Sequence, residues 1–393
     1  MKVLGIIVEY NPMHNGHIYQ IEQAKKLVKP DYTIVIMSGS FTEQGNISVL
    51  NKFDKADLAV KNGVDLVLEL PTIFASSSAE YFAKGAINIL NSLGTITHLA
   101  FGAECHDIKK LYNIANTLCS NHETIAKSCK EHKNKSINSA KTQAEVLSNI
   151  LNEEELEILQ KPNNILAIQY VKNILELKSS IVPVLIPRIG AEHGTSLVNG
   201  SFASSSAIRE LLNSESIKKV SGLVPQNVYE KLLDVDKVYL SRYWQLLKYE
   251  ITKLGVQGLK EIHEINEGLE NRFYSVAQVS KSYLDFLQAL QTKRYTLGRL
   301  KRICNNILLG ITLNKAYTIY TAYYARVLKV NKNATELLTL FNEHSTIPVI
   351  TSAKSANTKF HNVNLSLELD ALATKIHNLI FNTSCTEFTD IIK

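Results

Sequence analysis

The sequence has few cysteines and no long hydrophobic run, and each shortage excludes a class of protein. Its five cysteines form no CxxC pair, which argues against a disulfide framework or a zinc ribbon and favours a reducing cytoplasm. No apolar run approaches the roughly 18 residues that a membrane-spanning helix needs, so no membrane partner is expected. Charged residues make up 20% of the chain and apolar residues 45%, which excludes wholesale disorder.

The first 200 residues alternate short β-rich runs with helical patterns. Strands are predicted at 3–8, 32–37, 64–70, 97–101 and 182–186, and helices at 17–28, 54–61, 79–93 and 163–177. Alternation of this kind is typical of a parallel, doubly wound sheet. We therefore predict an α/β fold in which residues 1–212 form a Rossmann-like domain, with a helical insertion at about 120–160.

Residues 213–393 have a different character. Amphipathic helical patterns continue nearly to the end, and no convincing strand is seen after Ser206, so a mostly α-helical C-terminal domain is predicted. Charge also separates the two parts. Residues 281–332 have ten basic side chains and one acidic side chain. Residues 1–200, in contrast, have 19 basic and 20 acidic side chains. A local basic patch permits a polyanionic partner such as RNA.

The sharpest motif lies where the first strand meets the first helix. His14 and His17 flank Gly16 in a His-x-Gly-His turn. A helix N-terminus presents unpaired N–H groups and the positive end of its dipole to an anion, and a glycine lets the backbone approach a phosphate. Two imidazoles there can donate hydrogen bonds as charge builds on a leaving pyrophosphate. The turn predicts a nucleoside triphosphate site at the carboxyl end of the first strand.

A second candidate anion site opens a later helix. Ser204 and Ser205 begin a serine-rich run that is followed by Arg209, and hydroxyl, N–H and guanidinium groups would grip the same phosphates. Each motif has a plain structural alternative, namely surface histidines in a chance turn and an ordinary serine N-cap. The chain has no GxxxxGK[ST] pattern, and no GxGxxG follows the first strand. Neither a P-loop nor an ordinary dinucleotide fold is therefore expected.

Together the two motifs resemble those of the HxGH nucleotidyltransferase superfamily, and longer stretches resemble one family within it. These stretches are VEYNP at 8–12, MSGSF at 37–41, GVDLVLELP at 63–71, FGAE at 101–104, PNNILA at 162–167 and TKRYT at 292–296. All are similar to the bacterial tRNA(Met) cytidine acetate ligases, and the similarity spans essentially the whole chain. The block at 63–71 and the TKRYT stretch are far more specific than the histidine turn.

The resemblance implies an activity. Members of this family activate acetate with ATP, without acetyl-coenzyme A, and acetylate N4 of the wobble cytidine of elongator tRNA(Met). It implies that His14, His17 and Arg209 act on the phosphates, and that Mg²⁺ is bound mainly through ATP, because no dedicated carboxylate cage is seen. With the two serines of the second motif, the implied ATP site comprises Ile7, Val8, Glu9, Tyr10, Asn11, Pro12, Met13, His14, Asn15, Gly16, His17, Ile18, Tyr19, Gln20, Gly102, Asn163, Arg188, Ile189, Ser204 and Ser205.

The basic patch would grip the tRNA. Its predicted contacts are Lys293, Arg294, Tyr295, Arg299, Lys301 and Arg302. The spacing of the cations favours one helix face, and tyrosines 283, 295, 323 and 324 would stack on bases. The alternative is a solvated basic helix with tyrosines in the core. If the patch binds RNA, replacing Arg294 or Arg302 by alanine should weaken tRNA binding and spare ATP–pyrophosphate exchange.

Three positions depart from the family pattern. Met13 stands where phenylalanine is usual, Gln44 where an arginine often precedes the glycine at 45, and Lys55 where arginine is common. The first change alters packing only. The other two soften contacts to acetate or tRNA and leave the ATP site intact.

Two other functions are compatible with the same fold. One is a nucleotidyltransferase that adenylylates a phosphorylated small molecule, which would leave the basic C-terminal part without a purpose. The other is a non-catalytic RNA-binding protein, which would have no need of His14, His17 and Arg209. Nucleotide binding would separate the second alternative from the enzymes.

Overall fold

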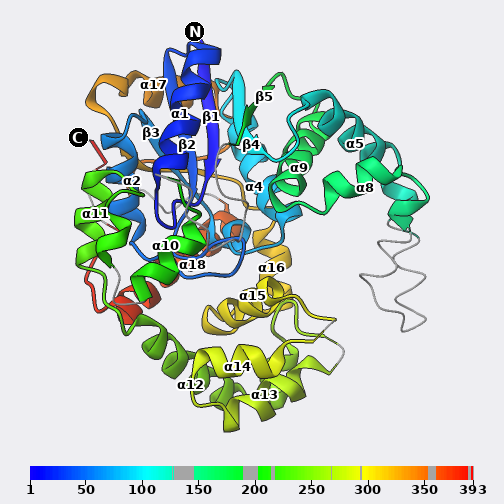
Figure 1. Cartoon of the computed structure of the whole chain (residues 1–393), viewed down its shortest axis with the longest axis vertical. Coiled ribbons are helices and arrows are strands. Elements are labelled where there is room, and N and C mark those ends of the chain that lie inside the picture. The colour runs from blue at the N-terminus through cyan, green and yellow to red at the C-terminus, as the bar shows by residue number, and fades with distance from the viewer. Residues whose placement is uncertain are drawn as a thin grey trace.

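A seven-stranded sheet forms the centre of the computed structural model (Figure 1), which describes residues 1–125, 127, 146–188, 202–213, 217–266, 268–292, 294–352, 360–387 and 391–392. The strand order is β5-β4-β1-β2-β3-β6-β7. The strands are β1 (Val3–Val8), β2 (Tyr32–Ser38), β3 (Leu66–Leu70), β4 (His98–Ala103), β5 (Val182–Pro187), β6 (Ala325–Val330) and β7 (Val349–Ile350). Strands β1 to β5 are parallel and match the five predicted strands.

Helices cover both faces of this sheet, as the doubly wound prediction requires. Alternate residues of β1 point to opposite faces, so Leu4 and Ile6 belong to one hydrophobic cluster and Val3 to the other. The first face carries α1 (Asn15–Val28), α2 (Lys52–Lys61), α10 (Ser205–Asn213) and α11 (Gln226–Leu233). The second face carries α4 (Ala79–Ser92), α5 (Ile108–Ser120) and α9 (Pro162–Glu176). The fold class is confirmed.

The remaining helices lie mostly in the C-terminal part. Helices α12 (Tyr239–Lys260), α13 (Leu269–Val279), α14 (Tyr283–Leu290) and α15 (Leu297–Leu308) lie together below the sheet in Figure 1. Of the predicted insertion at 120–160, residues 126 and 128–145 lie outside the described part of the chain. The further helices are α3 (Thr72–Ala75), α8 (Glu153–Leu159), η1 (Ile217–Val220), α12 (Tyr239–Lys260), α13 (Leu269–Val279), α14 (Tyr283–Leu290), α15 (Leu297–Leu308), α16 (Leu313–Ile319), η2 (Lys332–Ala334), α17 (Glu336–His344) and α18 (His361–Phe381).

The prediction that no strand follows Ser206 is wrong. Strand β6 pairs antiparallel with β3, and β7 pairs with β6, so the C-terminal part extends the N-terminal sheet. Strand β6 escaped the sequence analysis because Arg326 and Lys329 interrupt its apolar pattern. Arg326 is nevertheless only 5% exposed, and it pairs with Glu69 of β3 at 3.6 Å and with Glu387 at 2.5 Å. Its partners are distant in sequence, so the local pattern does not reveal its burial.

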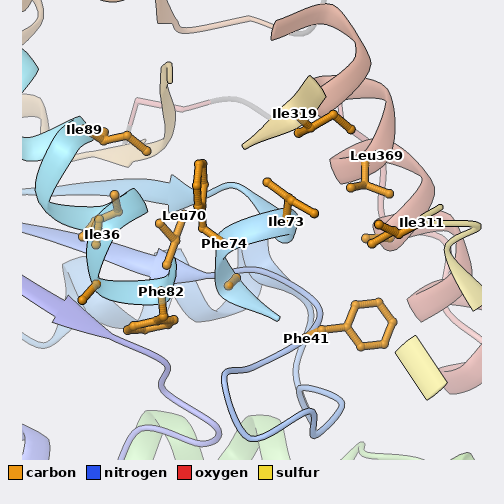
Figure 2. Close-up of a cluster of buried hydrophobic side chains, with 14 of the residues drawn as sticks. Ile36, Phe41, Leu70, Ile73, Phe74, Phe82, Ile89, Ile311, Ile319 and Leu369 are labelled. Atoms are coloured by element: carbon orange, nitrogen blue, oxygen red, sulfur yellow. The ribbon is translucent and has the colours of Figure 1, made fainter. Parts of the chain in front are cut away.

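A hydrophobic cluster joins the sheet to the C-terminal helices (Figure 2). Ile36 of β2 and Phe74 of α3 belong to the same cluster as Ile311, Ile319 and Leu369. Burial of apolar area on this scale favours a fixed arrangement. The two-domain division at residue 212 remains a prediction. Within the described residues, no helix has the length and apolar character needed to cross a membrane.

Candidate active site

The His-x-Gly-His turn lies at the carboxyl end of β1, between its neighbours β2 and β4. The connections from β1 and β4 leave in opposite directions at this point, which is where open α/β sheets bind ligands. His14 has an extended conformation and is the N-cap of α1. Gly16 is required because a Cβ there would lie 2.9 Å from the His14 ring. The sequence therefore places the turn correctly.

The two imidazoles have fixed tautomers. Nδ1 of His14 accepts the Gly16 N–H at 3.1 Å, and Nδ1 of His17 accepts the His14 N–H at 3.2 Å. The rings stack with centroids 3.7 Å apart. Because Nδ1 is an acceptor in each ring, the neutral imidazole carries its proton on Nε2. Each histidine therefore has an Nε2–H that can donate to an anion.

Both rings are held in the neutral form. Burial, with Arg188 and Arg209 nearby, lowers the pKa of His14 to about 3. Burial, followed by repulsion from His14 and Arg188, also lowers the pKa of His17 well below its ordinary value. At neutral pH the two histidines are hydrogen-bond donors and not permanent cations. They suit stabilisation of charge that develops during a reaction.

The second motif faces the first. The Ser204 hydroxyl accepts the Ala207 N–H at 3.1 Å, so the N-cap explanation holds for this serine. The Ser205 hydroxyl donates to the carbonyl of Pro12 at 3.3 Å. Arg209 donates to the carbonyl of Asn11 at 2.6 Å and to the Ser206 hydroxyl at 3.0 Å. These contacts join α10 to the histidine turn.

A cavity of about 280 Å³ lies between the two motifs. Five residues predicted for the ATP site do not line it: Asn11, Pro12, Met13, Asn15 and Ile18. The Asn11 side chain instead bonds backbone groups of residues 47 and 49, and Asn15 bonds those of residues 222 and 223. The described residues predicted for the phosphates or ATP that do line it are Ile7, Val8, Glu9, Tyr10, His14, Gly16, His17, Tyr19, Gln20, Gly102, Asn163, Arg188, Ser204, Ser205 and Arg209.

The β4–β5 side of the cavity is built around Arg188. Its Nη1 donates to Oδ1 of Asn163 at 3.3 Å, and the Asn163 amide donates to Glu104 at 2.5 Å. A Cβ at Gly102 would lie 3.3 Å from the Arg188 side chain, so the glycine permits this close approach. Ile189 lies outside the described residues. The three described residues that the family resemblance implied here are thus brought together.

The sequence analysis missed one wall of the cavity. The loop at residues 40–48, here called the pocket loop, contributes Glu43, Gln44 and Asn46 to the lining. Its backbone closes with a hydrogen bond from the Ser48 N–H to the Ser40 carbonyl at 2.9 Å. The resemblance at 37–41 pointed to this region without indicating a role. Of its residues that line the cavity, only Gln44 had been singled out, as a departure from the family pattern.

Lys55 lies beneath the pocket loop. Its Nζ donates to the carbonyls of Ser38 at 2.7 Å, Gly39 at 2.9 Å and Glu9 at 3.0 Å. Burial lowers the pKa of Lys55 to about 7, although Glu9 and Glu69 oppose the shift. The ammonium thus ties the end of β1 to the end of β2, which is a structural use of the cation at this position.

The basic patch is arranged differently from the prediction. Arg294 precedes α15, whose first residue is Leu297, so the cations do not share one helix face. Arg299 lies with its guanidinium 5.3 Å from the Tyr295 ring centroid. Lys301 donates to Oδ1 of Asn46 at 2.8 Å, and Arg302 donates to the Glu43 carbonyl at 3.2 Å. Lys293 lies outside the described residues.

The tyrosines of this region belong mainly to the core. Tyr283 and Tyr295 are each 7% exposed and Tyr324 is fully buried, so the expectation that they stack on bases is wrong for these three. Tyr323 is half-buried and stacks on Phe74 with ring centroids 5.5 Å apart. Aromatic residues interleaved with cations in a helical segment serve the hydrophobic core as readily as a nucleic-acid surface.

The described residues include no group of three histidine, cysteine or carboxylate side chains positioned to hold a metal ion. Two carboxylates, Glu9 and Glu43, line the cavity. Glu9 already accepts the Glu43 N–H at 2.7 Å. A pair of this kind can supplement the ligands of a cation that arrives with a phosphate but does not form a cage of its own.

The fold, the histidine turn and the serine helix define a nucleotidyltransferase of the HxGH type. A family model described as HIGH Nucleotidyl Transferase matches residues 1–390. The tRNA(Met) cytidine acetate ligase of Clostridium kluyveri is 36% identical over 395 residues, covering 97% of this chain and 95% of that protein. The ligase of the same name from Anoxybacillus flavithermus is 39% identical over 364 residues, or 90% of each.

Solved structures agree with these similarities. Thermotoga maritima TmcAL in its apo form I has a TM-score of 0.90 with this chain, and its complex with alpha-thio ATP has 0.89. Each is 31% identical and covers 100% of both chains. The chain belongs to the HIGH nucleotidyltransferase family and, within it, to the tRNA(Met) cytidine acetate ligases.

Proposed function

We propose that this protein is an ATP-dependent ligase that acetylates N4 of the wobble cytidine of elongator tRNA(Met) in the cytoplasm. One observation carries the proposal: two neutral imidazoles with fixed Nε2–H donors and the Arg209 guanidinium converge on one cavity. Membership of the family supplies the reaction, because its members are named for tRNA(Met) and acetate. A relative solved with an ATP analogue supports nucleotide binding.

The first step would form acetyl-adenylate. An acetate oxygen attacks the α-phosphorus of ATP, the bond to the bridging oxygen breaks, and pyrophosphate leaves. His14 and His17 donate Nε2–H bonds to phosphate oxygens, and Arg209 neutralises the β and γ end. No proton is transferred in this step, which suits histidines that stay neutral.

Mg²⁺ would enter with ATP as part of the substrate. Its ligands would come mainly from phosphate oxygens, with Glu9 and Glu43 as the available carboxylates of the cavity. The ion would neutralise charge on the departing pyrophosphate. This chain's own contribution is to position the phosphates between the histidine turn and the serine helix.

The tRNA would bind at the C-terminal helices. Arg294 and Arg299 approach the Tyr295 ring, with guanidinium carbons 5.6 and 5.3 Å from its centroid, and both belong to the basic patch. Lys293, Lys301 and Arg302 complete the proposed set. Cations of this kind bind the phosphate backbone and fix the orientation of the RNA.

The test is carboxylate-dependent exchange between ATP and labelled pyrophosphate. Acetate, propionate and no acid are compared, first without tRNA and then with purified elongator tRNA(Met). We expect exchange with acetate and, when tRNA is present, N4-acetylcytidine in the nucleoside digest. Absence of both with active, folded protein would refute the proposal.

A further inference from the structure

A carboxylate without an assigned role lies behind the Arg188 side of the cavity. Strands β4 and β5 are parallel, and their last paired residues are Ala103 and Pro187. Glu104 and Arg188 are the next residues of the two strands, so they leave the carboxyl edge of the sheet side by side. Arg188 and Asn163 line the cavity, whereas Glu104 does not. Glu104 can therefore act on the site only through its neighbours.

The Glu104 carboxylate caps the N-terminus of α9. Its Oε2 accepts the Asn164 N–H at 3.0 Å, and its Oε1 accepts the Asn163 side-chain amide at 2.5 Å. Lys161, the N-cap residue of α9, makes no side-chain capping bond among the described residues. A carboxylate at this end of a helix also meets the positive end of the helix dipole. Glu104 thus supplies a cap from β4, and two donors fix its position.

The same contact decides which way the Asn163 amide faces. An ionised carboxylate only accepts hydrogen bonds, so it must meet the NH2 group of the amide. The Asn163 oxygen is thereby turned away from Glu104, and it accepts from Nη1 of Arg188 at 3.3 Å. If the amide were reversed, its NH2 group would face the guanidinium, which has only donors. Glu104 therefore determines that Asn163 attracts Arg188.

This indirect arrangement keeps the charge of Arg188 available. A carboxylate in direct contact would cancel much of the field of the guanidinium, whereas an amide oxygen orients the group and leaves its charge. Burial lowers the pKa of Arg188 and Glu104 opposes the shift, so the carboxylate still favours the cationic form. The guanidinium lies in the wall of the cavity, where it would attract the phosphates of ATP.

We propose that Glu104 is a positioning residue for nucleotide binding, which orients the Asn163 amide and through it holds the Arg188 guanidinium toward the bound ATP. The proposal rests on the proposed function, because it takes ATP as the ligand of the cavity. The structural alternative is that Glu104 only caps α9. The two roles differ in one respect, because a cap would support α9 whether or not Arg188 is present.

The experiment is a double-mutant cycle on Glu104 and Arg188. Glutamine has one acceptor oxygen where glutamate has two. When that oxygen bonds the fixed Asn164 N–H, the glutamine NH2 group meets the Asn163 amide and turns it over. By equilibrium dialysis with ATP, we expect Glu104→Gln to raise Kd about tenfold, as for loss of one hydrogen bond to a charged group. In the Arg188→Met background the same change should raise Kd less than about twofold, because the group on which Glu104 acts is gone.

Steady-state exchange gives a second readout. Arg188 would bind ATP both before and during the reaction, so Glu104→Gln should raise the KM for ATP by the factor seen in Kd and leave kcat near wild type. Glu155→Gln is the matched control. Glu155 caps the neighbouring helix α8 through reciprocal bonds with Asn152 at 3.0 Å, and it does not line the cavity. Its Kd for ATP should equal that of wild type.

Equal factors for Glu104→Gln in both backgrounds would overturn the inference and assign Glu104 to the capping of α9 alone, and an unchanged Kd would overturn it too. Should Glu104→Gln not fold, Glu104→Asp, which withdraws the carboxylate by one methylene group, replaces it in the same cycle. A wild type that binds ATP without acetate-dependent exchange would instead refute the proposed function, and the binding cycle would still decide the role of Glu104.

Discussion

Two groups of ionisable side chains lie near the carboxyl ends of β1 and β3, the two strands that flank β2, and they differ in the partners that hold their charges. The first, here called the open group, is His14, His17, Arg188 and Arg209 beside β1. The second, here called the closed group, is Lys52, Glu69, Arg326 and Glu387 around β3. In the closed group, Lys52 bonds both Glu69 oxygens at 2.8 and 2.9 Å and pairs with Glu387 at 2.9 Å. In the open group, Arg209 bonds a backbone carbonyl and a hydroxyl.

The difference separates structure from chemistry. Burial opposes ionisation of Lys52, but Glu69 and Glu387 outweigh it and raise the lysine pKa. Opposite charges thus cancel within the closed group, which joins α2, β3, β6 and the C-terminal segment. Neutral acceptors hold Arg209 in position without cancelling its charge, so its field remains available to an anion. What distinguishes a ligand-binding site from a structural ion-pair cluster here is whether the partners of each charged side chain are neutral or oppositely charged.

The largest effect should come from breaking the closed group. Lys52→Met leaves Arg326 as the only cation that pairs with the two buried carboxylates Glu69 and Glu387 among the members of the closed group, and should lower the free energy of unfolding by about 3–5 kcal/mol. Urea denaturation measures this loss. The control is Lys61→Met on the same helix, which removes an exposed pair with Asp57 at 2.8 Å and should cost at most about 1 kcal/mol. Equal losses of unfolding free energy in both variants would show that the closed group does not stabilise the fold.

Breaking the open group should instead affect chemistry. His14→Asn retains a good N-cap for α1 but removes the Nε2–H donor. We expect acetate-dependent exchange to fall about 100-fold, as for loss of one donor to a developing charge, while urea stability changes little. His106→Asn, at an exposed position outside the cavity, is the control and should exchange normally. A stability loss that matches the activity loss would assign His14 to structure.

Arg302 is an intermediate case, because it pairs with Glu43 and Glu264 but also bonds the Glu43 carbonyl. Because Arg302 contacts the wall of the cavity, we no longer expect that replacing it by alanine spares ATP–pyrophosphate exchange. Arg302→Ala should release the pocket loop and lower exchange about tenfold or more through misplacement of the cavity wall. Arg294→Ala, before α15, should leave exchange intact and weaken tRNA binding with a reduced salt dependence. Filter binding and exchange assays on both variants separate these outcomes.

The sequence predicted the features that depend on neighbours along the chain. The five parallel strands and the helix after the histidine turn follow from local periodicity and turn chemistry. The turn also placed His14 and His17 correctly at the cavity. Whether these residues act on ATP stays a prediction.

Features that depend on distant partners were not predictable. Strand β6 is stabilised by Glu69 and Glu387, more than 50 residues away on either side of Arg326. Glu43 has no local signal because its role in the cavity depends on Glu9 and Arg302. The buried tyrosines of the basic patch were misjudged for the same reason, since only the packed helices show which ring faces the core.

The smallest expected effect is a pH dependence that arises from His14 of the open group. In the folded protein the pKa of His14 is lowered from 6.5 to about 3, by burial and the two nearby arginines. Between these values the unfolded chain binds a proton that the folded chain does not, so stability falls as the pH falls below 6.5. At pH 5.5 this costs about 1.4 kcal/mol. Urea unfolding of wild type and His14→Asn at pH 7.5 and 5.5 measures this difference together with any change in the pKa of the adjacent His17. A difference that is the same at both pH values would mean that His14 has the same pKa in the folded and unfolded chain, and the open group would then gain a cation below pH 6.5.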